Sequence, residues 1–314
     1  MIKILITAGG TATAWHICTV IKQYFSNEVE LHLCDINPSD LVPATILADK
    51  FHVVPPIKTE GYEEYMYSLL QREMIDIIIP LIDYDLEIFC SDNTSLKEIG
   101  VISTAPSKAV VNLLSNKKNM YHFLKEHNIP TPKLYDVNRI DVEEKYVLKS
   151  DVGFGSSSVR VVRGYEIPSL IKNDDIIQKF CDDEDHFEVT AEVFCHNERV
   201  EVFCRERRET KAGVCTKMKP IHDNRITSSI FRLASLLPLP RAFCIQFMYH
   251  NSQWEIIDCN LRLGAGTALS TAIGFQLTRA FIASLLGKEI TDDLFDVDPS
   301  VKSVVRVYDE VVLR

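Results

Sequence analysis

Hydrophobic runs alternate with segments of helical periodicity over the first 100 residues. Residues 3–9, KILITAG, form a continuous apolar run, as expected for a strand of a parallel sheet that is buried on both faces. The following segment, residues 11–25, has helical spacing. Because strands that alternate with helices imply βαβ units, the pattern predicts an open parallel sheet of the Rossmann-like type.

The same alternation continues to about residue 104. It places strands at 29–37, 51–55, 75–83 and 101–104, and helices at 62–74 and 86–100. Gly9 and Gly10 then lie at the carboxyl end of the first strand, where open parallel sheets bind ligands. A plain tight turn explains two glycines equally well. Asp83 and Asp85 lie at the end of another strand, where they either contact an amine substrate or cap a helix.

The pattern changes beyond residue 130. Two helical stretches fill residues 106–129, and the PTPK segment ends the second. Short runs then alternate polar and apolar residues, which predicts antiparallel strands before a last helix from about Ser270 to Leu286. These strands are expected at 145–150, 158–163, 176–180, 186–196, 199–209, 242–250 and 253–262. The fold class is therefore α/β, with a Rossmann-like domain followed by an α+β region with antiparallel sheets.

The composition indicates a soluble globular protein. The chain has 314 residues, 46% of them hydrophobic, and a mean hydropathy near zero. This length accommodates two or three domains, and no apolar run approaches the roughly 20 residues of a membrane span. A net charge of −10 argues against a general nucleic-acid binder.

The cysteines and histidines show no metal-binding spacing. The nine cysteines include no CxxC pair and the nine histidines no HxxxH or HExxH pair, so the spacing predicts no zinc site. Because the amino terminus shows no secretion signal, we expect reduced thiols and a cytoplasmic location. His16 follows the first glycines and is interpreted as a solvated helix residue.

Lys149 ends a strand-like run and precedes a loop rich in glycine and serine, KSDVGFGSSSVRV at 149–161. A hairpin loop explains flexible residues at this place. A phosphate cradle is the alternative, because glycines let backbone N–H groups approach anionic oxygens and serines add donors. The lysine would bring positive charge to the same place. The segment matches neither the P-loop pattern nor GxGxxG.

The predicted hairpin at 242–262 places polar side chains on one sheet face. Residues i and i+2 of a strand point to the same side, so Asp258, Asn260 and Arg262 project together. Gln246, on the partner strand, can face them. Such oxygen ligands suit Mg²⁺, and a forked guanidinium suits phosphoryl oxygens. A solvated sheet face with a surface salt bridge is the other interpretation.

Two further segments carry charges on predicted strands. Glu188, Thr190 and Glu192 share one strand face. A carboxylate there can accept hydrogen bonds from ribose hydroxyls, although a polar outer face of a strand explains the pattern as well.

The basic segment RERRETKAG, at 205–213, also has two interpretations. As a solvated strand edge it needs no ligand. As part of an active site, Arg205, Arg207 or Arg208, together with Lys211, could contact a transferred phosphoryl group or an acidic substrate.

The order of these pieces resembles the ATP-grasp superfamily. After the Rossmann-like domain comes NKKNMYHFLKEHNIPTP at 116–132, a lysine-bearing helix whose end is similar to the family's GIPTP. The strand lysine with its Gly/Ser loop, the IIQKF segment, an ExTxE strand and a hairpin ending in an ExNxR-like sequence follow in order. The resemblance covers nearly the entire chain and is nearest to the carboxylate–amine ligases similar to the large chain of carbamoyl phosphate synthase.

The resemblance implies a three-part organisation. Residues 1–105 would form the Rossmann-like domain, 106–180 the small ATP-grasp subdomain with the phosphate loop, and 181–314 the carboxyl-terminal subdomain with the Mg²⁺ and ATP site. The implied ligands are ATP and Mg²⁺, or Mn²⁺ in its place, with a small-molecule carboxylate and an amine as substrates. A homodimer is a further expectation from the family, whereas neither nucleic acid nor membrane is expected as a partner.

The resemblance also implies roles for individual residues, with Glu188 as the acid that binds ribose and residues 178–181 as the linker whose backbone reads adenine. The implied nucleotide-binding residues are Lys117, Lys149, Gly153, Gly155, Ser156, Ser157, Ser158, Gln178, Lys179, Phe180, Cys181 and Glu188. The implied Mg²⁺ ligands are Gln246, Asp258 and Asn260. The implied catalytic residues are Arg262, Lys211 and Arg208.

Four positions depart from the family pattern. Asp258 stands where Glu is usual, Leu261 where Pro is usual, Lys179 where Glu is common, and Asn116 where Asp precedes the first lysine. Asp is a shorter arm than Glu but is still a hard oxygen ligand, so metal binding is expected with an altered geometry. These changes place the chain among the divergent members.

The implied reaction is a ligation driven by ATP. A substrate carboxylate attacks the γ-phosphate to give an acyl phosphate and ADP, and an amine then displaces phosphate to form an amide. A nucleotide-binding regulatory protein without catalysis is the alternative, because the metal motif is altered. A dinucleotide-dependent oxidoreductase is disfavoured, because AGGTATAWH at 8–16 lacks the third glycine at its required spacing.

Overall fold

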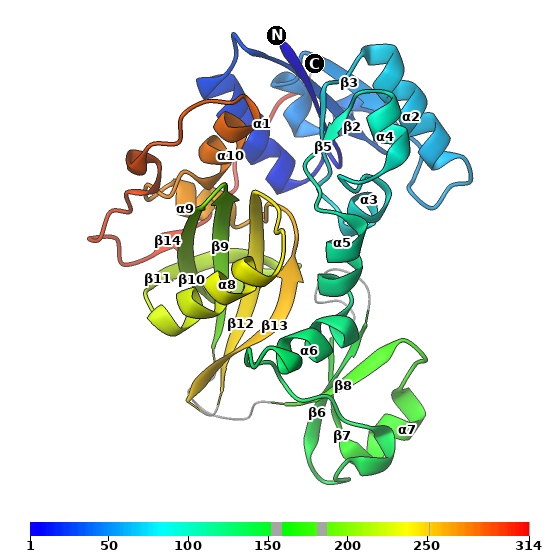
Figure 1. Ribbon diagram of the computed structural model, residues 1–314, viewed down its shortest axis with the longest axis vertical. Coiled ribbons are helices and arrows are strands. Elements are labelled where there is room, and N and C mark those ends of the chain that lie inside the picture. The colour runs from blue at the N-terminus through cyan, green and yellow to red at the C-terminus, as the bar shows by residue number, and fades with distance from the viewer. Residues whose placement is uncertain (152–158, 181–186, 251, 314) are drawn as a thin grey trace.

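Three sheets organise the chain in the computed structural model, which describes residues 1–151, 159–180, 187–250 and 252–313. A parallel sheet lies in the amino-terminal part, and a small and a larger antiparallel sheet follow (Figure 1). The predicted class, a Rossmann-like α/β part followed by antiparallel α+β structure, is confirmed. The domain boundaries at residues 105 and 180 stay predictions.

The amino-terminal sheet has the strand order β3-β2-β1-β4-β5. Its strands are β1 (Ile2–Ile6), β2 (Val29–Asp35), β3 (Lys50–Val53), β4 (Ile77–Ile79) and β5 (Ile102–Ser103). Helix α1 (Ala12–Tyr24) packs with Ile4 on one side of the sheet, and α2 (Tyr62–Glu73) packs with Leu5 on the other. Successive residues of one strand therefore enter two cores, which explains the continuous apolar runs.

Two predicted elements of this part are too long. The strand predicted at 75–83 is reduced to the three residues of β4, and helix α3 (Asp83–Ile88) begins shortly after it. The helix predicted at 86–100 is divided into α3 and α4 (Thr94–Glu98). The division has a local cause, because the Asn93 side chain accepts a backbone hydrogen bond and caps a new helix start.

The small sheet is antiparallel, with the order β7-β6-β8. Its strands are β6 (Lys145–Ser150), β7 (Arg160–Arg163) and β8 (Asp175–Lys179), and the short helix α7 (Ile167–Leu170) follows β7. Tyr146, Leu148 and Ile177 belong to a hydrophobic core of its own.

The large sheet is antiparallel, with the order β13-β12-β9-β10-β11-β14. Its strands are β9 (Glu188–His196), β10 (Arg199–Lys211), β11 (Val214–Ile221), β12 (Ala242–His250), β13 (Gln253–Asn260) and β14 (Val304–Val305). The predicted hairpins β9–β10 and β12–β13 are present. Asn197 adopts the left-handed conformation that the first turn requires (φ 54°).

Helices cover both faces of the large sheet. Helix α8 (Asn224–Leu236), which the sequence analysis did not predict, packs on one face together with α5 (Lys108–Leu114) and α6 (Lys117–Glu126). On the other face lie α9 (Thr267–Thr271) and α10 (Leu277–Leu285). The single helix predicted at 270–286 is thus two helices.

The amino-terminal part and the large sheet share one hydrophobic core. Ile17 of α1 and Phe281 of α10 belong to the same cluster as Phe194 and Phe203 of the sheet. Figure 1 shows α1 and α10 side by side. Among the described residues, no helix combines the length and the apolar character needed to cross a membrane.

Candidate functional site

Two predicted phosphate-binding lysines meet the predicted metal-binding strand. Lys149 lies on β6, and its Nζ donates to the backbone oxygen of Ile257 on β13 (3.1 Å). Lys117 is the first residue of α6, and its Nζ lies 3.9 Å from Asp258 Oδ1. Both lysines are about nine-tenths buried. The structure therefore brings together positive charges from α6 and the small sheet with a carboxylate of the large sheet.

Asp151 ties the start of α6 to the end of β6. Its carboxylate accepts hydrogen bonds from the Lys118 backbone N–H (2.8 Å) and from the Asn116 side-chain amide (2.9 Å). Its backbone oxygen accepts from the Lys117 N–H (3.0 Å). A carboxylate at a helix amino terminus satisfies backbone donors that have no partner within the helix. Asp151 thus fixes Lys117 and Lys149 relative to each other.

Burial changes the charge state of Lys149. Desolvation lowers the pKa of its ammonium from 10.5 to about 8, with Lys117 adding repulsion and Asp258 opposing the shift. A buried lysine prefers to be neutral unless an anion compensates its charge. The lysine pair is accordingly suited to bind a polyanion, which would supply that compensation.

Glu188, Arg207 and Gln246 form a second group beside Asp258. Gln246 of β12 lies opposite Asp258 of β13 in the strand register. With its amide oriented to satisfy both neighbours, its nitrogen donates to Glu188 Oε1 (3.3 Å) and its oxygen accepts from Arg207 Nη1 (3.1 Å). Arg207 also pairs with Glu188 and donates from Nη2 to the Gly213 backbone oxygen (2.8 Å).

The three predicted metal ligands differ in whether other residues already engage their side-chain oxygens. The Asp258 side chain is about one-third exposed, at 34%. Asn260 makes no side-chain hydrogen bond to the described residues. The Gln246 oxygen, in contrast, is engaged by Arg207. Two hard oxygen donors beside buried lysines fit a Mg²⁺–phosphate group, with Asp258 and Asn260 better placed to hold the ion than Gln246.

The three predicted catalytic residues each contact other side chains. Arg262 pairs through Nε with Asp83 Oδ1 of α3 (3.0 Å), a contact between the large sheet and the amino-terminal part. Arg208 is half-exposed and pairs with Glu206. The ammonium of Lys211 lies 5.7 Å from the centre of the Tyr308 ring. Their catalytic roles stay proposals.

Glu192 is not on a solvated strand face. It is completely buried, and its carboxylate accepts from Arg205 Nε (3.1 Å) and from the Ser270 hydroxyl. Arg205 is also buried, and its Nη1 has no hydrogen-bond partner among the described residues. This buried ion pair joins β9, β10 and α9, so Arg205 has a structural role beside whatever ligand it contacts.

The linker residues are described only in part. Gln178 is buried and donates to the Pro132 backbone oxygen (3.2 Å), whereas the Lys179 side chain pairs with Glu144 at the surface (3.4 Å). The Phe180 N–H donates to the Lys145 backbone oxygen (3.1 Å). The remaining predicted nucleotide-binding residues lie outside the described residues: Gly153, Gly155, Ser156, Ser157, Ser158 and Cys181.

Side chains of the protein itself fill the space beside the glycine turn after β1. The Asp35 carboxylate accepts from the Gly10 N–H (2.7 Å), and a side chain at Gly9 would collide with Leu33. These contacts support a tight turn. His16 is not solvated as expected: it contacts Thr271 of α9 (3.2 Å), and burial, helped by Arg306, lowers its pKa to about 4.

Asp83 and Asp85 have different surroundings. Asp83 faces Arg262, as described above. Asp85 is completely buried under Tyr62, whose hydroxyl donates to it (2.9 Å), and desolvation raises the pKa of the Asp85 carboxyl to about 6. Of the two, Asp83 is the more exposed, with 22% of its side chain accessible.

Two protein-family models match successive segments of this chain. A model described as the PylC-like N-terminal domain matches residues 4–104, and a model of the ATP-grasp domain matches residues 114–266. The chain belongs to the ATP-grasp family. The resemblance drawn from the motif order is thereby confirmed. A search of curated protein sequences found no significant match.

Solved structures of other proteins share the fold. The biotin carboxylase domain of the Hydrogenobacter thermophilus 2-oxoglutarate carboxylase superposes with a TM-score of 0.74 at 15% identity, covering 94% of this chain and 72% of that one. N5-carboxyaminoimidazole synthetase from Staphylococcus aureus gives 0.73 at 13%, covering 93% and 78%. N5-carboxyaminoimidazole ribonucleotide synthetase from Thermotoga maritima gives 0.71 at 18%, covering 94% and 78%.

Two residues that contact the predicted site residues were not singled out by the sequence analysis. Arg207 was weighed only as one of several arginines, yet it is the one that contacts Glu188 and Gln246. Asp151 stood next to the predicted loop without a role, although it caps α6. A signal for Asp151 existed, because Asn116 replaces the usual acid and supplies the amide that Asp151 accepts from.

Proposed function

We propose that this ATP-grasp protein is an ADP-forming ligase that couples a small carboxylate to an amine. The observation that carries the proposal is the convergence of Lys117, Lys149 and Asp258 between the small and the large sheet. Two buried ammonium groups beside a partly exposed carboxylate are arranged for a triphosphate and its Mg²⁺ ion. The same convergence lies in the domain that the ATP-grasp model matches.

The residues divide into two tasks. Lys117 and Lys149 would bind the phosphates, whereas Asp258 and Asn260, assisted by Gln246, would hold Mg²⁺, or Mn²⁺ in its place. The bound ion would neutralise charge on the phosphoryl oxygens. Glu188 would accept from the ribose hydroxyls, and its partner Arg207 would keep the carboxylate oriented.

Phosphoryl transfer needs positioning and charge neutralisation more than covalent help. In the first step, an oxygen of the substrate carboxylate bonds to the γ-phosphorus, the bond to the ADP oxygen breaks, and an acyl phosphate forms. In the second step, the amine nitrogen bonds to the acyl carbon, inorganic phosphate leaves, and the nitrogen releases a proton. Because Lys117 and Lys149 contact the phosphates in both states, they would serve both steps.

The solved ATP-grasp structures support these ligands. The Hydrogenobacter thermophilus domain is described in complex with MgADP, ADP and bicarbonate, and a Staphylococcus aureus N5-carboxyaminoimidazole synthetase in complex with ADP. For this chain, the identity of the carboxylate and the amine is open. Asp83, which faces Arg262 at the carboxyl edge of the parallel sheet, is a candidate contact for a cationic amine.

A nucleotide-product assay tests the proposal. The protein is incubated with ATP, Mg²⁺ and pooled amino acids and small carboxylates, and ADP is separated from AMP by chromatography. We expect ADP that depends on the pool and is lost in Lys149→Ala and Asp258→Ala. Lys22→Ala, which removes an ion pair with Asp49 in the amino-terminal part, is the matched control and should keep activity. AMP, or no turnover despite ATP binding, would contradict a ligase of this type.

Two coarser expectations accompany the proposed activity. The eight cysteines of the described residues are all free thiols, most of them buried, which supports a reducing compartment such as the cytoplasm. A homodimer is the proposed assembly, by analogy with the biotin carboxylase domain that is described as a dimer. Sedimentation analysis of the purified protein tests it.

A further inference from the structure

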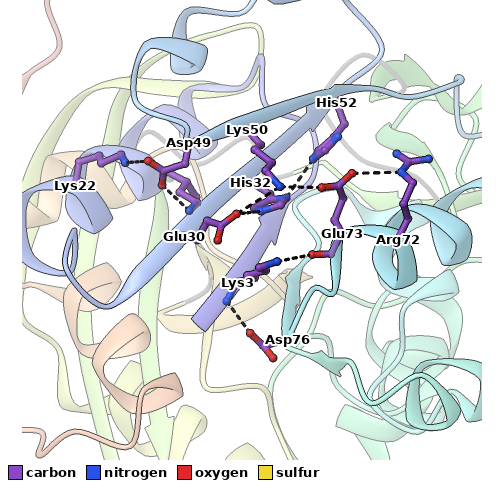
Figure 2. Close-up of polar contacts among 11 residues, drawn as sticks. Lys3, Lys22, Glu30, His32, Asp49, Lys50, His52, Arg72, Glu73 and Asp76 are labelled. Carbon is purple, nitrogen blue, oxygen red and sulfur yellow. Dashed lines mark hydrogen bonds and ion pairs between the residues drawn. The ribbon is translucent and has the colours of Figure 1, made fainter. Parts of the chain in front are cut away.

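A second polar cluster lies in the amino-terminal part, outside the nucleotide site. It consists of His32 on β2, His52 on β3 and Glu73 at the end of α2. The Nδ1 atom of His32 is 3.1 Å from Nε2 of His52, and one ligand atom of each residue lies within 4.8 Å of those of the others. Figure 2 shows the three side chains pointing toward one another. Within the described ranges, no other trio of His, Cys, Asp or Glu meets this criterion.

A carboxylate orients the His32 ring, as is usual for a histidine that binds a metal. It is completely buried, and its Nε2 lies 3.0 Å from Glu30 Oε1, which accepts the proton on that nitrogen. This bond leaves Nδ1, the nitrogen that faces His52, as the lone-pair atom. A carboxylate that fixes the tautomer and the ring orientation is the usual outer partner of a ligating histidine.

We propose that His32, His52 and Glu73 form a binding site for Zn²⁺ or a similar divalent transition metal. Zinc–nitrogen bonds of about 2.0–2.1 Å in a tetrahedral site place two ligand nitrogens about 3.3 Å apart. The separation of 3.1 Å between the two imidazole nitrogens is close to that value. Two imidazoles with one carboxylate suit zinc rather than Mg²⁺ or Ca²⁺, which prefer oxygen ligands alone. Water would take the fourth position.

Two cations already pair with Glu73, and such a metal would compete with both. Lys50 Nζ lies 3.1 Å from Glu73 Oε2 and 3.6 Å from Glu30 Oε1, and its side chain is about half exposed. Arg72 Nε lies 3.2 Å from Glu73 Oε1, and its side chain is more than half exposed. A flexible, half-exposed lysine can turn away into water at small cost. When the metal binds, its positive charge compensates the negative charge of Glu73. The His52 ring then carries its proton on Nδ1, which leaves Nε2 free to bind the metal.

The position of the cluster indicates a structural metal. Near the cluster, Lys3, in the amino-terminal half of β1, donates from Nζ to the Glu73 backbone oxygen (2.9 Å). The glycine turn that faces the rest of the protein follows the opposite end of β1. A metal at this place would cross-link β2, β3 and α2 without touching the nucleotide. The spacing of histidines and cysteines along the sequence did not indicate this site, because its ligands come from three separate elements.

Cobalt binding tests the proposal, because tetrahedral Co²⁺ absorbs visible light and substitutes for Zn²⁺. The full chain, stripped with a chelator and kept free of nucleotide, is titrated with Co²⁺ and then with Zn²⁺. We expect one bound Co²⁺ with tetrahedral absorption that Zn²⁺ displaces. His52→Gln and Glu73→Gln should abolish the absorption, and Glu30→Gln should weaken binding about 10- to 100-fold. His222→Gln, an exposed histidine outside the cluster, is the control.

Lys50→Ala guards against variants that simply unfold. It keeps every proposed ligand and removes the cation that contacts both Glu73 and Glu30, while Arg72 stays paired with Glu73. We therefore expect it to bind Co²⁺ more tightly than the unmodified chain does. A chain that gives no tetrahedral absorption would overturn the proposal. Absorption that persists in both ligand variants, or binding that Lys50→Ala leaves unchanged or weakens, would do the same, since the cluster would then be an ion-pair network centred on the lysine.

Discussion

At the scale of single residues, the nucleotide site depends on how burial and neighbouring charges set each side chain. Lys149 is the clearest case, because desolvation lowers the pKa of its ammonium to about 8. Arg207 is the second, because its contacts with Glu188 and Gln246 place it inside the cluster. Each supports a prediction of its own.

ATP affinity should fall as the pH rises through about 8. Lys149 then loses its proton in the free protein and, with it, the attraction to the phosphates. We expect the Kd for MgATP to rise about tenfold for each pH unit above 8, and calorimetric titration measures it. Lys149→Arg keeps its charge over this range and should show a flat profile. An equally steep profile in Lys149→Arg would assign the pH dependence to another group.

Arg207 should matter more than Arg208. Removing the Arg207 guanidinium leaves Glu188 without its charge partner and Gln246 without a donor. We expect Arg207→Ala to lower kcat/KM for ATP about 10- to 100-fold, the size of effect known for a residue that orients a binding group. Arg208→Ala removes only a surface pair with Glu206 and should lose less. Steady-state kinetics measure kcat/KM for both variants. A larger loss in Arg208→Ala than in Arg207→Ala would assign the active-site role to Arg208 instead.

The sequence could not separate these arginines for a physical reason. The register between β10 and β11 shifts on both sides of Glu209, so strict alternation does not hold across the basic segment. No sequence pattern indicated the partner of Arg262 either. Strand β13 ends at Asn260, the Arg262 N–H donates back to the Asn260 oxygen (2.8 Å), and the Arg262 side chain pairs with Asp83.

At the scale of elements, the cap of α6 connects stability to function. Asp151 holds the start of α6, where Lys117 stands, to the end of β6, which carries Lys149. Helix α8 has a comparable cap, since the Asp223 side chain accepts from the Arg225 N–H (2.9 Å), but it lies on the outer face of the large sheet. The two caps form a matched pair.

Asp151→Ala should weaken both the fold and ATP binding. Asn116 still caps α6 in this variant, because its side chain accepts from the Asn119 N–H (2.8 Å). Loss of the additional Asp151 acceptor should therefore cost about 1 kcal/mol of unfolding free energy, which urea denaturation measures. Asp223→Ala also leaves the buried Trp254 Nε1 without its acceptor (2.7 Å), so it should cost at least as much stability and still leave the Kd for ATP unchanged. If both variants, or neither, changed the Kd, Asp151 would be an ordinary cap without a role in positioning the lysines.

The elements themselves were predictable to different degrees. The strands of the amino-terminal sheet followed from continuous apolar runs, because both faces of that sheet are covered. Helix α8 was missed although Ile226, Ile230 and Leu233 recur at helical spacing after Asp223. The last helix was predicted as one element, whereas Gly274, at a φ of 108°, interrupts the helical pattern between α9 and α10.

At the scale of the whole molecule, two of the connections between the amino-terminal part and the large-sheet region join described residues that are far apart in the sequence. One is the shared hydrophobic core between α1 and α10. The other is the ion pair between Asp83 and Arg262, both mostly buried. Because these residues are 179 positions apart, no local sequence pattern could predict their contact.

The Asp83–Arg262 pair should couple the two parts energetically. We expect a double-mutant cycle of Asp83→Ala and Arg262→Ala, measured by denaturant unfolding, to give a coupling of about 1 kcal/mol or more. Additivity of the two single variants within about 0.3 kcal/mol would mean that the pair contributes nothing to holding the parts together.

The acyl phosphate is the central claim about this protein, and an isotope experiment tests it most directly. Once the pooled assay has identified the carboxylate, it is supplied with ¹⁸O in both carboxyl oxygens together with ATP, Mg²⁺ and the amine. The account predicts one ¹⁸O atom in the inorganic phosphate released, because the carboxylate oxygen that attacks the γ-phosphorus leaves with the phosphate. Label in AMP, or phosphate without label, would contradict it.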